Sequence, residues 1–155
     1  VVGKILSLTE KNYNDQILRE TLWNSKALSS DVTAAMNPVY KSVHDIENVA
    51  RLSYGLAFAK YTGSRGKSMA NDADAEFIQE IRQIFDKNEI KYQSGGFGKV
   101  DEGGGGTVAK FLAYYGIRTI DAGPALLSMH SLFEISSKAD LYETYRAYKV
   151  FFELN

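Results

Sequence analysis

The chain contains no cysteine among its 155 residues, and it has only two prolines and two histidines. Disulfides, thiol catalysis and cysteine-ligated zinc are therefore excluded, and a metal site would need histidine, aspartate and glutamate. A protein without cysteine fits an intracellular location, and we expect a cytoplasmic protein. No apolar run approaches the roughly 18 residues of a membrane helix, and the first residues lack the basic segment of a signal peptide.

A dominant charge is also lacking, because 18 basic residues balance 19 acidic residues to a net charge of -1. We therefore expect no nucleic-acid partner and no membrane partner that depends on net charge. The length is that of one ordinary domain, and a hydrophobic content of 45% is enough for a substantial core. The sequence begins at Val1 in mid-element and without methionine, so we expect a fragment or a processed piece.

Helical and strand-like segments alternate along the chain. Helices are predicted over residues 1–24, from 71 or 72 to about 88, over 107–115 and over 138–153, and short strands over 27–32, 54–60, 90–93 and 117–121. This alternation indicates an α/β fold, a layered sandwich with a mostly parallel sheet flanked by helices. Residues 1–25 form leading helices and residues 26–155 carry the motifs described below.

Apolar spacing predicts which faces of these helices are buried. One helix is expected to bury Phe77, Ile81, Ile84 and Phe85. The helix over 107–115 would bury Val108, Phe111, Leu112 and Tyr115, and the last helix Leu141, Tyr145, Tyr148 and Phe152. The segments 63–68 and 95–106 are predicted as loops from their glycine content.

Two residues could bind a metal. Asp31 ends a predicted strand, and His130 lies in the apolar segment Leu126-Leu-Ser-Met-His130. For a lone aspartate the commoner role is a turn or a helix cap, and for a lone histidine it is a buried neutral ring. The alternative is that each is a ligand of zinc, manganese or cobalt. Sites in parallel sheets form at the carboxyl ends of strands, where both residues are expected.

The run Gly103-Gly-Gly-Gly-Thr107 precedes a predicted helix. Backbone amides at such a point can hold an anion, but no Lys-Ser/Thr pair follows at the spacing of a P-loop. A flexible loop is the simpler interpretation. Lys60 ends a predicted strand. Its side chain either snorkels to the surface or places a cation in a pocket.

Five motifs occur in an order that closely resembles the C-terminal third of the aspartyl aminopeptidase and vacuolar aminopeptidase I family, with bacterial clostridial-type members nearest. The resemblance covers about residues 26–155. The motifs are Leu28-Ser-Ser-Asp31, Lys60-Tyr-Thr-Gly-Ser64, Asn71-Asp-Ala-Asp-Ala-Glu-Phe77, Gly98-Lys-Val-Asp-Glu-Gly-Gly-Gly-Gly-Thr107 and Asp121-Ala-Gly-Pro-Ala-Leu-Leu-Ser-Met-His-Ser131.

The resemblance implies a zinc aminopeptidase with two metal ions in each active site, cobalt or manganese being alternatives. It acts on peptides, is a homo-oligomer and assembles as a dodecamer. Asp31 would be a ligand of one ion and His130 a ligand of the other. Lys60 would line the pocket for the N-terminal side chain of the substrate. Substrate contacts would also come from Met129 and from Gly104, Gly105, Gly106 and Thr107.

Other parts of the family pattern are missing. The remaining ligands, the general base and the inserted dimerisation domain would precede Val1, and some members have histidine where this chain has Ala34. The resemblance therefore implies no catalytic residue in this fragment, which should be inactive alone. Two other functions stay open: a non-catalytic scaffold or assembly module of the same fold, and an anion- or nucleotide-binding α/β domain that uses the glycine-rich loop.

Overall fold

The computed structural model describes residues 1–65, 68–96 and 98–153. Its centre is a four-stranded sheet with the strand order β1-β7-β3-β6. These strands are β1 (Lys26–Ser29), β7 (Arg118–Gly123), β3 (Leu56–Ala59) and β6 (Tyr92–Ser94). β1 is parallel to β7 and β3 is parallel to β6, whereas β3 and β7 are antiparallel. The predicted α/β class with a mostly parallel sheet is confirmed.

Two smaller sheets lie beside the central one. The first contains β2 (Thr33–Ala34), β8 (Ala125–Leu127) and β9 (Ile135–Ser136), and the second is a hairpin of β4 (Tyr61–Ser64) and β5 (Ser68–Asp72). The hairpin corrects the prediction of a loop over 63–68, of which Gly66 and Lys67 lie outside the described residues. Its strands are fixed by tertiary contacts, such as the bond from the Asn71 side chain to the Thr119 carbonyl, which local composition does not reveal.

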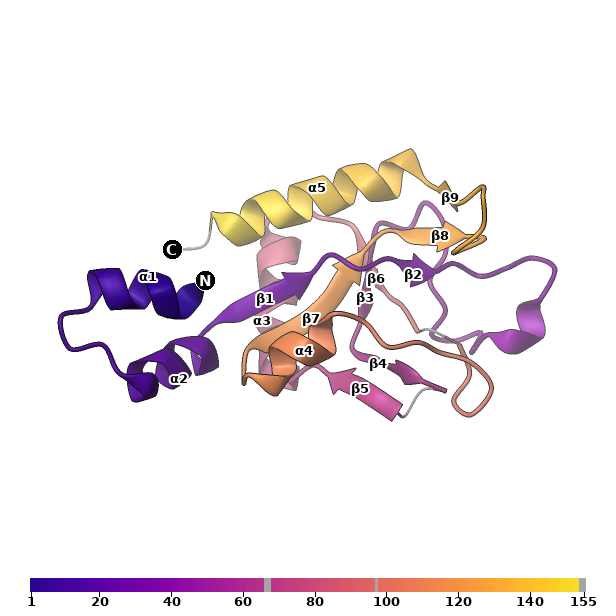
Figure 1. The fold of residues 1–155 in the computed structure, drawn as a ribbon. Coiled ribbons are helices and arrows are strands. Elements are labelled where there is room, and N and C mark those ends of the chain that lie inside the picture. The colour runs from indigo at the N-terminus through magenta and orange to yellow at the C-terminus, as the bar shows by residue number, and fades with distance from the viewer. Residues whose placement is uncertain (66–67, 97, 154–155) are drawn as a thin grey trace.

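The main core lies between the sheet and two helices, α3 (Ala75–Lys87) and α5 (Lys138–Phe152). Figure 1 shows α5 running along the sheet. On α3, the side chains of Phe77, Ile81 and Phe85 are fully buried, so the predicted stripe on this helix is confirmed. The Phe85 ring stacks on Phe58 of β3 with 5.4 Å between ring centroids.

The predicted buried face of α5 is wrong at three of its four residues; the fourth, Tyr148, is half-buried and donates its hydroxyl to the Ala122 carbonyl. Leu141, Tyr145 and Phe152 are exposed, whereas Asp140, Thr144 and Ala147 are buried. The buried stripe has helical spacing but consists of small and polar residues, and hydrophobicity alone does not identify such a stripe. The Asp140 carboxylate accepts hydrogen bonds from the backbone amides of Ser53 and Gly55, so its burial is compensated.

The helix α4 (Ala109–Tyr114) is shorter than predicted and starts two residues later. Three of the four residues of its predicted buried face, Val108, Phe111 and Tyr115, are exposed, and the small Ala109 is buried instead. The fourth, Leu112, is half-buried. The predicted helix over 1–24 is two helices, α1 (Val2–Thr9) and α2 (Asp15–Trp23). They are separated because the Asn14 side chain caps α2.

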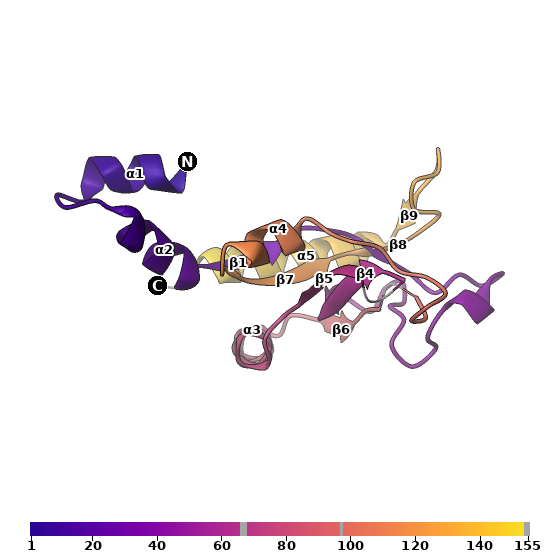
Figure 2. The ribbon, with the colours of Figure 1, turned by 60° about the horizontal axis from the view of Figure 1, so that its bottom comes forward.

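The two leading helices extend beyond one end of the central sheet, as Figures 1 and 2 show. At the other end lies a loop with a short 3-10 helix, η1 (Lys41–Val43), which lines a cavity together with β8. Within the described ranges, no helix is both long and apolar enough to cross a membrane.

The α3 cap gives a test of the fold. The sequence predicted that this helix starts at 71 or 72, but it starts at Ala75. Asp74 caps it by accepting a bond from the Phe77 amide, and it also binds Arg118. We expect Asp74→Ala to lower the free energy of unfolding by about 1–2 kcal/mol. Asp72→Ala, the matched control, should lower it by less than about 0.5 kcal/mol because its ion pair with Lys60 is exposed. Urea denaturation measures both.

The effect of Asp74 should depend on pH. The hydrogen bond from Arg118 lowers the pKa of the Asp74 carboxyl. A lowered folded-state pKa stabilises the fold above the ordinary aspartate pKa of about 4, and this stabilisation is lost as pH falls through the lowered value. The difference between the unaltered chain and Asp74→Ala should therefore be full at pH 6 and should shrink in acid. An equal difference at pH 6 and pH 2 would contradict the role of this ion pair.

Candidate metal and substrate site

Asp31 lies in the segment between β1 and β2, two residues beyond the end of β1, and its side chain is half-buried. This segment packs tightly against the end of β7. A Cβ atom added to Gly123 would lie only 2.2 Å from the carbonyl oxygen of Asp31. The position of the Asp31 backbone is therefore fixed by a glycine that allows the close approach.

A second carboxylate, Asp121, lies nearby and is 2% exposed. Its Oδ2 atom accepts a hydrogen bond of 2.7 Å from the Thr107 hydroxyl, and the Thr62 hydroxyl lies 3.4 Å from the same atom. Among the described residues, Oδ1 of Asp121 has no hydrogen-bond partner. Burial raises the pKa of the Asp121 carboxyl, the neighbouring hydroxyls of Ser29, Thr107 and Thr62 partly oppose this shift, and the charge of Asp31 adds to it. Asp31 and Asp121 therefore belong to one electrostatic cluster.

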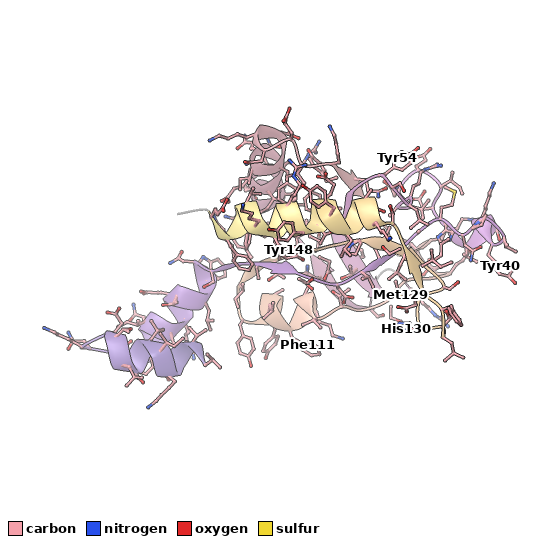
Figure 3. The ribbon with its side chains drawn as sticks, turned by 90° about the horizontal axis from the view of Figure 1, so that it is seen from above. Tyr40, Tyr54, Phe111, Met129, His130 and Tyr148 are labelled. Carbon is pink, nitrogen blue, oxygen red and sulfur yellow. The ribbon has the colours of Figure 1, made fainter. Side chains whose placement is uncertain are left out.

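His130 lies in an exposed turn between β8 and β9, with a φ angle of 68°. Its backbone amide donates to Oε1 of Glu134, which stabilises the turn. Figure 3 shows Met129 and His130 next to each other in this turn. Because β2 pairs in parallel with β8, with Thr33 opposite Ala125, Asp31 lies before this paired segment and His130 beyond it. Asp31 and His130 thus lie beyond opposite ends of this pairing. Because His130 is exposed, the apolar setting expected for it is not observed.

The two residues have the chemistry of metal ligands. Among the described residues, neither the Asp31 carboxylate nor the His130 ring has a hydrogen bond or an ion pair, so each is free to bind a metal. Carboxylate oxygen and imidazole nitrogen are both common zinc donors. No group of three or more histidine, aspartate or glutamate side chains within 1–65, 68–96 and 98–153 could hold an ion. A complete metal site therefore needs ligands from elsewhere.

The other histidine, His44, is the buried one, with an exposed fraction of 6%. Its Nε2 atom accepts a hydrogen bond from the Asn37 amide, and burial lowers the pKa of its imidazole. The buried neutral histidine considered for His130 is thus found at His44. An adjacent cavity of about 360 Å³ is lined by His44, Ala34, Leu126 and Met129.

Lys60 lines a different cavity, of about 590 Å³, together with Phe58, Arg82 and Tyr92. Its ammonium group is exposed and forms an ion pair with Asp72. Lys60 and Met129 therefore lie in separate cavities, and the structure does not bring them together in one pocket.

The glycine-rich segment, Gly103–Gly106, precedes α4 in the chain. Gly104 and Gly106 are exposed, whereas Thr107 is 5% exposed and directs its hydroxyl to Asp121. α4 begins at Ala109 and has six residues, so the glycines do not themselves open the predicted helix. The buried cluster of Asp121, Thr107 and Thr62 was not found from sequence. The only local signal for it is a carboxylate in the middle of an apolar strand.

Comparisons with known proteins agree with this fold. Residues 1–152 match a family model described as aminopeptidase I zinc metalloprotease (M18). A probable M18 family aminopeptidase 1 from Borreliella afzelii (strain PKo) is 57% identical over 153 residues, which are 99% of this chain and 33% of that protein. The chain thus spans about a third of the length of such relatives.

Two solved structures are similar. A crystal structure of an M18 aminopeptidase from Thermotoga maritima has a TM-score of 0.90 and 51% identity, and the match covers 96% of this chain and 33% of that one. Aminopeptidase I from Clostridium acetobutylicum gives a TM-score of 0.82 and 50% identity, over 94% of this chain and 33% of that one. On these grounds the chain belongs to the aminopeptidase I zinc metalloprotease family, M18.

Proposed function

We propose that this chain is part of the catalytic domain of a metal-dependent aminopeptidase, which removes N-terminal residues from peptides. The observation that carries the proposal is the family match over residues 1–152, together with a fold that matches the Thermotoga maritima enzyme at a TM-score of 0.90. Because the chain spans a third of that enzyme, the remaining ligands and the general base would come from the other two thirds.

In this proposal Asp31 holds one zinc ion and His130 holds the other. Their free carboxylate and imidazole groups support this assignment. No three-ligand cluster occurs within the described residues, so the other ligands of each ion would come from the rest of the enzyme. A bound zinc pair would polarise the scissile carbonyl and lower the pKa of a water molecule. Cobalt and manganese are alternatives with the same donors.

Substrate contacts complete the proposal. Lys60 would face the N-terminal side chain of the peptide from its cavity, and Gly104–Gly106 would meet the peptide backbone. Met129 would contact the substrate beside His130. Thr107 directly follows these glycines and is buried. Its proposed role is therefore to hold the glycine-rich segment in place rather than to contact the substrate with its side chain.

Assembly as a homo-oligomer, a dodecamer in the complete enzyme, is also proposed. A Saccharomyces cerevisiae structure described as a dodecamer has a TM-score of 0.71 to this chain. Its identity of 24% supports the shared fold alone. The scaffold alternative remains for the isolated chain, which lacks a complete metal site among its described residues. The anion-binding alternative has little support because α4 is short and begins after the glycines.

Activity measurements test the proposal. We expect the chain alone, purified with zinc, to release no anilide from aminoacyl anilides. A chimera in which residues 1–155 replace the matching third of the Thermotoga maritima enzyme should release it, and chelation should stop the release. Activity of the chain alone would contradict the expected inactivity. A folded, zinc-loaded but inactive chimera would favour the scaffold alternative.

A further inference from the structure

The glycines that follow β6 and the residue Thr107 before α4 are both attached beside the segment that carries Asp31. After β6, the Gly95 α-carbon faces Thr33, because a Cβ atom added there would lie 3.3 Å from the Thr33 side chain. Before α4, Thr107 donates to Asp121, and Asp121 is opposite Ser29 in the register of β1 and β7. The described stretch 98–107 therefore ends at a residue beside the segment that carries Asp31.

The two attachments differ in kind. The start of the loop is held by a backbone bond, because the Gly95 amide donates to the Phe58 carbonyl. Further along, the Lys99 amide donates to Val43. The C-terminal end depends on a side-chain bond of 2.7 Å, from Thr107 to the buried Asp121. The Gly103 amide is also held, by a bond of 2.9 Å to the Lys99 carbonyl. Beyond it, glycines have no side chains to pack, so the Thr107 bond has a large share in ordering Gly104–Gly106.

We propose that Asp121 is a positioning residue which, through the Thr107 hydroxyl, fixes the glycine-rich segment beside Asp31 so that it can bind the peptide backbone of the substrate. The proposal rests on the proposed aminopeptidase function and adds a residue to it. Asp121 is 2% exposed, so it acts through Thr107 and does not itself touch substrate. A buried carboxylate is tolerated here because hydroxyl donors from two separate segments meet at one of its oxygens.

Two Thr→Val substitutions, which keep the shape of the side chain, distinguish positioning of the glycine-rich segment from simple stabilisation of the Asp121 carboxylate. Thr107→Val and Thr62→Val each remove one hydroxyl near Oδ2 of Asp121, but only Thr107 belongs to the loop. Thr107→Ser keeps the donor. In the chimera, we expect Thr107→Val to raise KM about tenfold, the ratio that corresponds to one hydrogen bond. It should change kcat less than about threefold, because uniform binding is lost. Thr62→Val and Thr107→Ser should leave KM within about threefold.

The order of the loop can be measured in the chain itself, without activity. In NMR relaxation of the 155-residue chain, the order parameters of Gly104–Gly106 should fall from about 0.8 to below about 0.6 in Thr107→Val. They should stay unchanged in Thr62→Val and Thr107→Ser. Unchanged order in Thr107→Val, or equal effects of Thr107→Val and Thr62→Val, would overturn the proposal. An inactive unsubstituted chimera would count against the proposed function only, because the NMR result would still decide the positioning role.

Discussion

Replacing Gly123 by alanine is expected to destabilise the fold by about 3 kcal/mol. The added Cβ atom would lie 2.2 Å from the carbonyl oxygen of Asp31 and 2.9 Å from its carbonyl carbon. Both contacts are with backbone, so no side chain can rotate away, and the segment between β1 and β2 must separate from β7. Chemical denaturation of the chain would measure the change as a lower urea midpoint.

Gly96→Ala is the matched control, because a Cβ atom there would meet its nearest neighbour, the Asn48 carbonyl oxygen, at 3.4 Å. We expect it to change stability by less than about 1 kcal/mol. If Gly123→Ala were as stable as Gly96→Ala, the close packing of β7 against the Asp31 segment would be wrong.

The same substitution should impair the proposed active site. Separation of the two segments displaces Asp31, and a displacement of about 1 Å can reduce the rate about 100-fold. In the chimera, Gly123→Ala should therefore lose far more activity than Gly96→Ala under conditions in which both are folded. Circular dichroism at the assay temperature would establish the folded fraction of each.

The sequence predicted the part of the fold that follows from periodicity. The buried face of α3 was predicted correctly because Phe77, Ile81 and Phe85 repeat with helical spacing and face the sheet. The bounds of α5 were also predicted closely, but its buried face was not, because its apolar residues occur on several faces and its buried face contains Asp140 and Thr144. That burial is compensated by bonds to Ser53 and Gly55, more than 80 residues away in sequence, which no local pattern reveals.

The candidate site was predicted only in part for a similar reason. Asp31 and His130 were identified by motif, but their surroundings depend on long-range pairing. The carboxylate beside Asp31 is Asp121, and it is held by hydroxyls from β4 and from the glycine-rich loop. The buried histidine is His44, whose ring accepts a bond from Asn37 seven residues away. Burial and partners of this kind are set by the tertiary fold.

The largest expected effect on function is the loss of metal. If Asp31 and His130 each hold a separate ion, removal of either ligand should remove one ion and leave the other bound. A single lost ligand typically leaves a zinc site with too few donors to retain the metal. Activity should fall at least about 1,000-fold in either variant, because a co-catalytic pair acts as a unit. Asp15→Ala, at the exposed start of α2, is the control for loss of an unrelated aspartate.

The zinc content of the chimera, measured by mass spectrometry after dialysis, tests the central claim most directly. We expect about two ions per subunit in the unsubstituted chimera and in Asp15→Ala, and about one in both Asp31→Ala and His130→Ala. Two ions retained in Asp31→Ala and His130→Ala, with all variants folded, would contradict the claim that these two residues are ligands of separate ions.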